Sequence, residues 1–197
     1  TEYQAFGGIH PQHVTILPFT RLNGGPMDYT PGIFVMNLSE FCPSNPSRVN
    51  ATIANQLALY LTMYSPLQMA ADFPEHYMRF CDAFQFIKDV AVDWQQSRYL
   101  MAEPGDYIVV ARQAKKTRQW VAGGVTDENR RTLSVPLAFL DRGKKYEATI
   151  YADAADADYR TNPQAYTVVR KKVDCSSELA LTLAPGGGFA ISFQEIK

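Results

Sequence analysis

Apolar residues recur at helical spacing in two stretches of the first ninety residues. The first stretch carries one stripe with the i, i+4, i+7, i+8 spacing of a buried helix face. Asn50 stands where an N-cap belongs, and Ser65-Pro66 ends the pattern because proline lacks an N–H and clashes with the preceding turn. The sequence therefore predicts a helix between these two signals. Its apolar stripe consists of Ile53, Leu57, Tyr60, Leu61 and Tyr64.

A second helix is predicted a few residues further along. Asp72 is suited to cap it, Pro74 suits the first helical turn, and Glu75 complements the positive end of the helix dipole. Two helices do not enclose a core by themselves, so their apolar faces must cover each other, the rest of the chain or a partner. The apolar face of the second helix consists of Tyr77, Phe80, Cys81, Phe84 and Ile87.

From residue 107 onward the period of the pattern changes to two, which is typical of strands. Turn signals at residues 127–129, 141–143 and 185–188 separate the alternating segments. Many short strands without an intervening helix indicate an antiparallel β-sandwich. The predicted strands cover residues 107–110, 120–122, 132–135, 146–151, 166–169, 179–183 and 189–193.

The first 35 residues leave two alternatives open. Residues 14–17 have strand-like β-branching, but Pro18 fits a central strand poorly. Alternatively, a short helix covers residues 18–23 and ends at Gly24-Gly25, since glycine is the usual helix C-cap. In either case we expect a multidomain α and β chain, with a mainly helical piece over residues 1–90 and an antiparallel β-sandwich over residues 91–197.

Composition and charge narrow the classes of function. Of the 197 residues 46% are hydrophobic, which is enough to bury a core, and 19 Lys+Arg balance 20 Asp+Glu to a net charge of -1. This balance gives no electrostatic reason to bind nucleic acid or an anionic membrane. No apolar run reaches the ~20 residues that span a bilayer. The cysteines at positions 42, 81 and 175 lack CxxC spacing, so we expect no structural zinc site; three cysteines cannot all pair, and their separation in sequence disfavours the one disulfide that stays open.

Glu2 and Asp28 are candidates for a chemical role, and each also has an interpretation without one. The chain opens Thr1-Glu2-Tyr3 without an initiator Met or a recognisable signal peptide, as a processed product or a fragment of a longer protein would. Taken alone, Glu2 is a solvated terminal charge. Asp28 lies in residues 24–32, a loop rich in Gly and Pro, where an Asp either serves function or bonds its own backbone in a turn.

Other polar clusters do not form a known catalytic or metal motif. The D-x-x-D-x-D spacing of Asp153, Asp156 and Asp158 lacks the glycine and glutamate of an EF-hand, so we interpret it as a turn-rich loop. The glycines at 186–188 lack the Lys and Ser/Thr of a P-loop and are expected to form a hairpin turn. The three histidines, His10, His13 and His76, lack the spacing of a helical zinc site.

The stretch from His13 to Phe34 reads HVTILPFTRLNGGPMDYTPGIF, and it resembles glycoside hydrolase family 97, the α-glucosidase and α-galactosidase family. A complete member has an amino-terminal β-sandwich, a (β/α)8 barrel and a smaller carboxy-terminal β-sandwich. The resemblance spans nearly the whole chain, and it implies that residues 1–90 are the C-terminal fragment of the barrel and residues 91–197 the last sandwich. The segments similar to that sandwich are 93–94 with 98–100, 104–112, 149–153 and 183–188.

The same resemblance assigns roles to particular residues. It implies that the two helices close the barrel, with their apolar stripes covered by barrel strands absent from this sequence. Residues 25–29 would be the short last strand and its catalytic-face loop. Glu2, in a Glu-Tyr pair like that of the family, would be the general acid beside a calcium ion, and Asp28 would face the substrate. The second catalytic carboxylate and the other calcium ligands would precede this sequence.

The resemblance implies the hydrolysis of terminal α-linked glucosyl or galactosyl residues in oligosaccharides, and with it we expect a bacterial enzyme that is periplasmic or secreted. The isolated chain is expected to be inactive, since an acid without its partner carboxylate completes half of the mechanism. Two alternatives stay open. The sandwich could be a non-catalytic carbohydrate-binding module that uses exposed Trp or Tyr rings, or a structural module that stabilises the barrel.

Overall fold

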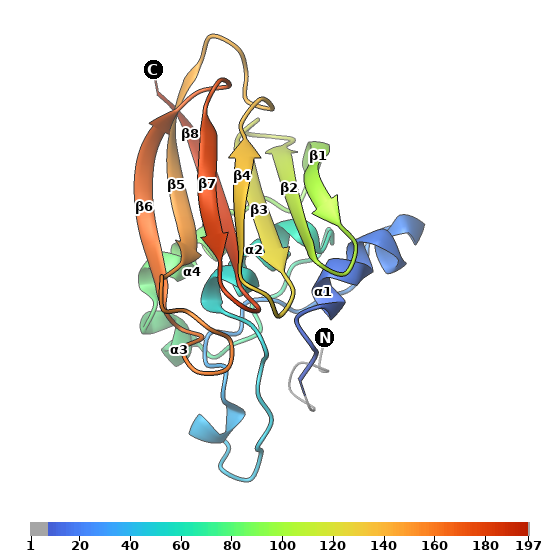
Figure 1. Ribbon diagram of the computed structural model, residues 1–197, viewed down its shortest axis with the longest axis vertical. Coiled ribbons are helices and arrows are strands. Elements are labelled where there is room, and N and C mark those ends of the chain that lie inside the picture. The colour runs from blue at the N-terminus through green and yellow to red at the C-terminus, as the bar shows by residue number, and fades with distance from the viewer. Residues whose placement is uncertain (1–7, 197) are drawn as a thin grey trace.

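The computed structural model describes residues 8–196 of the chain (Figure 1). Short helices form its first half and strands its second half. The α-helices are α1 His13–Ile16, α2 Ile53–Thr62, α3 Pro74–Met78 and α4 Cys81–Asp89, and the 3₁₀ helices are η2 Leu17–Phe19, η3 Arg21–Gly24 and η4 Leu38–Glu40. The strands are β1 Trp94–Glu103, β2 Tyr107–Ala114, β3 Trp120–Thr126, β4 Arg131–Pro136, β5 Lys145–Asp153, β6 Tyr166–Val173, β7 Glu178–Leu183 and β8 Gly188–Ile196.

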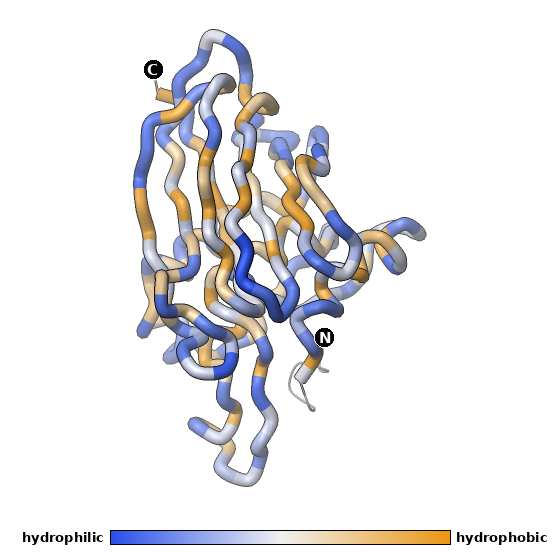
Figure 2. The backbone as a smooth tube through the Cα atoms, viewed as in Figure 1, coloured by the Kyte–Doolittle hydropathy of each residue, from blue (hydrophilic) through white to orange (hydrophobic). Residues whose placement is uncertain are grey.

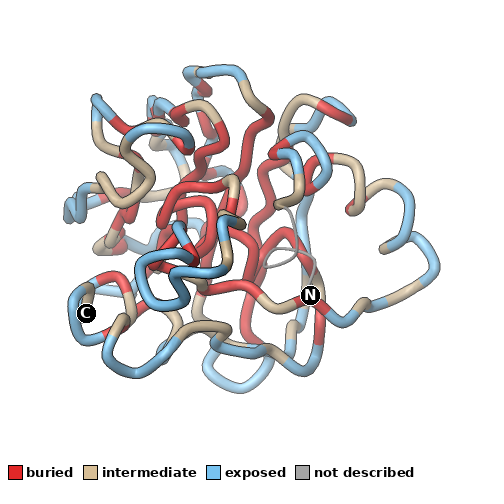
Figure 3. Tube along the Cα trace, turned by 90° about the horizontal axis from the view of Figure 1, so that it is seen from below, coloured by how far each residue is buried: buried red, intermediate tan, exposed pale blue. Residues whose placement is uncertain are grey.

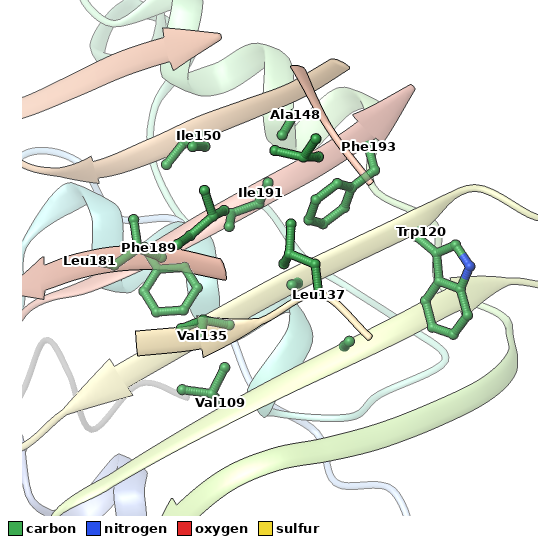
Figure 4. Close-up of a cluster of buried hydrophobic side chains, with 14 of the residues drawn as sticks. Val109, Trp120, Val135, Leu137, Ala148, Ile150, Leu181, Phe189, Ile191 and Phe193 are labelled. Atoms are coloured by element: carbon green, nitrogen blue, oxygen red, sulfur yellow. The ribbon is translucent and has the colours of Figure 1, made fainter. Parts of the chain in front are cut away.

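The strands form two antiparallel sheets that pack face to face. The larger sheet has the order β1-β2-β3-β8-β5-β6, and β4 and β7 pair to form the smaller sheet in front of it in Figure 1. The predicted antiparallel β-sandwich is confirmed, and each of the seven predicted strands forms. Between the sheets lies an apolar core with Val109, Trp120, Ile150 and Phe189 among its members (Figure 4). The loop between β4 and β5 includes a hydrophilic stretch in Figure 2, but Leu137, Phe139 and Leu140 in its first half belong to the core between the sheets.

The strand pattern alone did not indicate β1. It is an edge strand that pairs only with β2, and most of its residues are exposed or half-buried on both faces. Its register shifts between Trp94 and Gln96 and again between Tyr99 and Met101. Because a strand without a buried face has no reason to alternate, the period-two signal is absent.

Helix α2 lies against the face of the larger sheet that is remote from the smaller one, and every one of its residues is buried. Its side chains Leu57 and Leu61 share a cluster with Val121 of β3 and Ala190 of β8. Figure 3 shows the buried backbone in the centre of the molecule, with exposed loops around it. The expectation that strands outside this sequence cover the apolar stripe of the first helix is wrong, because the chain's own sheet covers it.

The helix boundaries differ from the prediction in two places. Thr52, not Asn50, caps α2, because its hydroxyl oxygen accepts a hydrogen bond from the backbone N–H of Asn55 at 3.1 Å. The second predicted helix is divided into α3 and α4. Phe80, with φ −134° and ψ 49°, breaks it, and Cys81 is exposed instead of buried.

Residues 13–24 are helical, so the strand alternative for residues 14–17 is wrong. The chain runs through α1, η2 and η3, and Gly25 ends this run with φ 120°, a conformation that favours glycine. Residues 25–29 form no strand within the described chain, contrary to the role that the resemblance gave them. The barrel itself stays a prediction, as does the boundary between residues 90 and 91. No described helix has the length and apolar character needed to cross a membrane.

Candidate functional site

The loop that carries Asp28 is anchored through its backbone. The guanidinium of Arg21 donates to the carbonyls of Gly25 and Pro26, each at 3.4 Å. The N–H of Met27 donates to the carbonyl of Tyr64, just beyond the end of α2, at 3.2 Å. These bonds fix the path of the loop on both sides of Pro26, so the position of Asp28 depends on them.

Asp28 and Tyr29 have opposite environments. Asp28 is exposed and makes no hydrogen bond to another described residue, so its carboxylate is accessible to a ligand. Tyr29 is 2% exposed, and burial raises the pKa of its phenol well above the ordinary range. The buried ring therefore anchors the loop while the neighbouring carboxylate faces solvent.

A groove of about 590 Å³ lies beside this loop. Met27 and Tyr29 line one side, and His10, His13 and Ile16 are among the residues on the other. Asp28 does not line it, and Glu2 lies outside the described residues, so the structure does not bring these two predicted site residues together. The lining contains no carboxylate within the described part of the chain.

The residues from position 8 to 196 contain no group of three or more His, Cys, Asp or Glu side chains suited to hold a metal ion. The aspartates of the D-x-x-D-x-D segment have separate roles. Asp156 accepts from the amide of Asn162 at 2.9 Å, and Asp158 accepts from the backbone N–H of Arg160 at 2.7 Å. These two are turn residues, as predicted from sequence, whereas Asp153 is buried.

Asp153 holds the N-terminal end of α2. One carboxylate oxygen accepts from the Thr52 hydroxyl at 2.6 Å, and the other accepts from the N–H groups of Ala184 and Gly188, each at 2.8 Å. Burial raises the pKa of this carboxyl to about 6, although its three hydrogen bonds act in the opposite direction. Asn55 adds a bond from its side-chain amide to the carbonyl of Gly187 at 3.1 Å.

Arg112 of β2 holds the opposite end of α2. It is 2% exposed, and its Nε donates to the carbonyl of Leu61 at 2.7 Å. Its guanidinium lies 5.3 Å from the ring centroid of Tyr64 and 6.0 Å from that of Trp94. One terminal nitrogen has no hydrogen-bond partner within the described chain, and burial lowers the pKa of the group.

The segment that follows Asp28 is held by side chains of the helical region. The Gln56 carbonyl oxygen accepts from the N–H groups of Gly32 and Ile33, at 2.9 and 3.1 Å. The Asp72 carboxylate accepts from the N–H groups of Phe34 and Val35, at 2.7 and 3.0 Å. Asp72 thus supports a distant backbone segment, and its side chain does not cap α3 as the sequence suggested.

Sequence reasoning missed Arg112, Asp153 and Gln56 as organising residues. Arg112 could have been noticed, because it interrupts a strand that is apolar on both faces. Asp153 shares the strand face of Tyr151, which is the face that α2 covers. No local signal distinguishes Gln56 from other polar residues of the helix, because its partners lie 23 and 24 positions away in sequence.

The described residues thus form an antiparallel sandwich whose larger sheet is covered by helices, and they do not bring the predicted site residues together. The family described as "Glycosyl-hydrolase 97 C-terminal, oligomerisation" matches residues 93–194. The chain belongs to this family, and the resemblance found from the sequence is confirmed.

Similar proteins support the same assignment. The chain is 37% identical over 183 residues to a "Retaining alpha-galactosidase" of Bacteroides thetaiotaomicron, covering 91% of the chain and 27% of that protein. It is 46% identical to a glycoside hydrolase family 97 enzyme of Pseudoalteromonas sp. strain K8, solved with acarbose, with a TM-score of 0.91 over 95% of the chain and 29% of the enzyme. A β-arabinopyranosidase structure with 21% identity and a TM-score of 0.76 shares the fold. The chain therefore spans less than a third of these relatives' length.

Proposed function

We propose that this chain is the C-terminal part of a larger glycoside hydrolase that removes terminal α-linked glucosyl or galactosyl residues from oligosaccharides. The observation that carries the proposal is the 46% identity over 95% of the chain to family 97 structures, one solved with acarbose and another with panose. The similarity to a retaining α-galactosidase is the reason to keep galactosyl substrates beside glucosyl ones.

The proposed mechanism uses a carboxylic acid to protonate the glycosidic oxygen. Glu2 supplies this proton, and a second carboxylate in a segment that this sequence does not hold either activates water or attacks the anomeric carbon. Asp28 hydrogen-bonds a sugar hydroxyl, since its carboxylate is exposed on a loop whose backbone is fixed on both sides. In this proposal residues 1–90 belong to the (β/α)8 barrel and residues 91–197 form the last sandwich.

The proposal also includes a calcium ion beside the catalytic acid and the cellular location of the enzyme. The described residues do not contain a calcium site, so Glu2 is the one ligand that we propose from this chain, and no step is routed through the metal. Calcium bound in the whole enzyme would supply positive charge next to the acid. We also propose a bacterial enzyme that is periplasmic or secreted, which fractionation of the source cells would test.

The first experiment assays the isolated chain with 4-nitrophenyl α-glucoside and α-galactoside. We expect no turnover above a Glu2→Gln control, because the second carboxylate is missing. Turnover that the control lacks would show that this chain holds a complete site, and the proposed division of the mechanism would then be wrong.

The second experiment places Glu2→Gln in the whole enzyme. Loss of a general acid lowers the rate for an unactivated oligosaccharide by about 10²–10⁴-fold. An aryl glycoside with an acidic phenol needs little protonation, so its rate should fall far less. Asp28→Asn is the matched control, because loss of a substrate contact lowers both rates alike. Equal losses for both substrates with Glu2→Gln would exclude the acid role.

A carbohydrate-binding module is not favoured by the sandwich. Trp120 is 1% exposed, and Trp94 is half-buried with the Arg112 guanidinium against it. Among the Trp and Tyr side chains described in residues 91–197, Tyr99 alone is classed as exposed. A structural role is the second candidate, because the matched family is described by oligomerisation. Sedimentation of the chain at several concentrations tests that role, and a monomer throughout would argue against it.

A further inference from the structure

Two buried charges of the sandwich clamp the two ends of α2, and their signs match the helix dipole. The carboxylate of Asp153 lies at the N-terminal end, where backbone N–H groups give a partial positive charge. The guanidinium of Arg112 lies at the C-terminal end, where carbonyls give a partial negative charge. The larger sheet therefore fixes both the position and the direction of this helix.

From Arg112 a short series of contacts leads to the loop that carries Asp28. The guanidinium lies over the Tyr64 ring and binds the Leu61 carbonyl. The Tyr64 carbonyl then accepts the N–H of Met27, which directly precedes Asp28. Two residues, Tyr64 and Met27, thus separate the sandwich from the exposed carboxylate.

We propose that Arg112 is a positioning residue: the C-terminal sandwich uses it to hold the Gly25–Tyr29 loop in place for the sugar. This inference rests on the proposed function, in which that loop faces the substrate. It gives the sandwich a part in the reaction in addition to any role in assembly. Displacement of a binding group by about 1 Å costs on the order of 100-fold in rate, so a small shift of the loop has a large effect.

The burial of Arg112 has two opposed effects on stability, since the charge is desolvated while the side chain supplies hydrogen bonds. The guanidinium donates to the Leu61 carbonyl and the Ser97 hydroxyl, and its remaining terminal nitrogen has no hydrogen-bond partner and no carboxylate within ion-pair distance among the described residues. Burying a charge without a counter-charge is costly, and an apolar side chain of similar volume is often equally stable or more so. Methionine would relieve this cost, but it would leave the Leu61 carbonyl and the Ser97 hydroxyl without their donor, so stability by itself does not distinguish a positioning role from a stabilising one.

The first test uses amide hydrogen exchange in the chain itself. Arg112→Met should raise the exchange rate of the Met27 amide by about tenfold or more relative to that of Ile191 in the central strand β8, since local opening of the loop becomes easier. Arg131→Met is the matched control, because Arg131 binds Asp106 and Asp127 but has no contact with α2. Unchanged relative protection of Met27 would overturn the proposal.

The second test measures kcat and KM of the whole enzyme with an α-glucoside and an α-galactoside. Arg112→Met should lower kcat/KM by about tenfold at a temperature at which the variant remains folded, and Arg131→Met should leave kcat/KM unchanged. Combined with Asp28→Ala, the Arg112→Met effect should be much smaller than in the parent enzyme, because both act on one contact. Additive effects would overturn the proposal. A parent enzyme that cleaves neither substrate would refute the proposed function, and the exchange result would still decide whether Arg112 holds the loop.

Discussion

Removal of the Asp153 side chain should destabilise the chain more than removal of any neighbouring aspartate. Asp153→Ala leaves the N–H groups of Ala184 and Gly188 and the hydroxyl of Thr52 without their acceptor, in a region closed to water. Each unsatisfied buried group costs about 1–3 kcal/mol, and relief of the buried charge offsets part of this. We expect a net loss of about 3 kcal/mol in the free energy of unfolding, in keeping with these costs.

Urea unfolding at pH 7, followed by the fluorescence of the two tryptophans, measures this loss. Asp156→Ala is the matched control, because Asp156 is exposed and belongs to the same segment. Its cost should stay below about 1 kcal/mol, as for most exposed substitutions. If both variants lost the same stability, the reasoning about the buried acceptor would be refuted.

The same carboxyl predicts a pH dependence. Its pKa in the folded chain is about 6, above the value of about 4 in an unfolded chain, so folding favours the protonated form. The stability that it contributes is full below about pH 4 and is lost as the pH rises through 6, by about 3 kcal/mol in total. Asp153→Asn cannot titrate, so the stability difference between parent and variant should fall across this range. A constant difference would show that the carboxyl does not titrate there.

Two further substitutions test the local geometry. A methyl group on Gly187 would lie 1.9 Å from the Asp153 carboxylate and 2.7 Å from the Ala184 carbonyl. Gly187→Ala should therefore lower the free energy of unfolding by about 3 kcal/mol. A loss below about 1 kcal/mol would contradict this packing. Arg118 has φ 58° in the turn between β2 and β3, a conformation in which glycine is unstrained. Arg118→Gly should therefore raise the urea midpoint by the equivalent of about 1 kcal/mol. A lower midpoint would be evidence against strain at this residue.

Most of the seven predicted strands have at least one face on a core, whereas β6 is exposed along most of its length and was predicted from its β-branched residues. Alternation records that burial directly, as in β7, whose residues alternate between exposed and buried. The remaining strand β1 lies at an edge and carries Gln96, Ser97 and Arg98, so neither face leaves a period-two signal. The sequence pattern therefore predicts strands that have a buried face or a run of β-branched residues, and it misses an edge strand that has neither.

Contacts between distant residues account for what the sequence did not reveal. Thr52 replaces Asn50 as the cap, and its hydroxyl also meets Asp153, 101 positions away. Arg112 meets the helix end 51 positions away. The spacing of residues along the sequence does not indicate such pairs. Asp28 was identified through a family resemblance, and the structure adds that its side chain is accessible, while Glu2 lies outside the described residues.

The enclosure of α2 by the larger sheet has a consequence for how the chain can be divided. A protease cut near residue 90 would sever the peptide bond without releasing two pieces, because the helix and the sheet bury each other's apolar side chains. The nicked halves should elute together from a sizing column under native conditions. The sandwich produced without residues 1–90 would expose the apolar face that α2 covers, and it would precipitate or bind a hydrophobic dye.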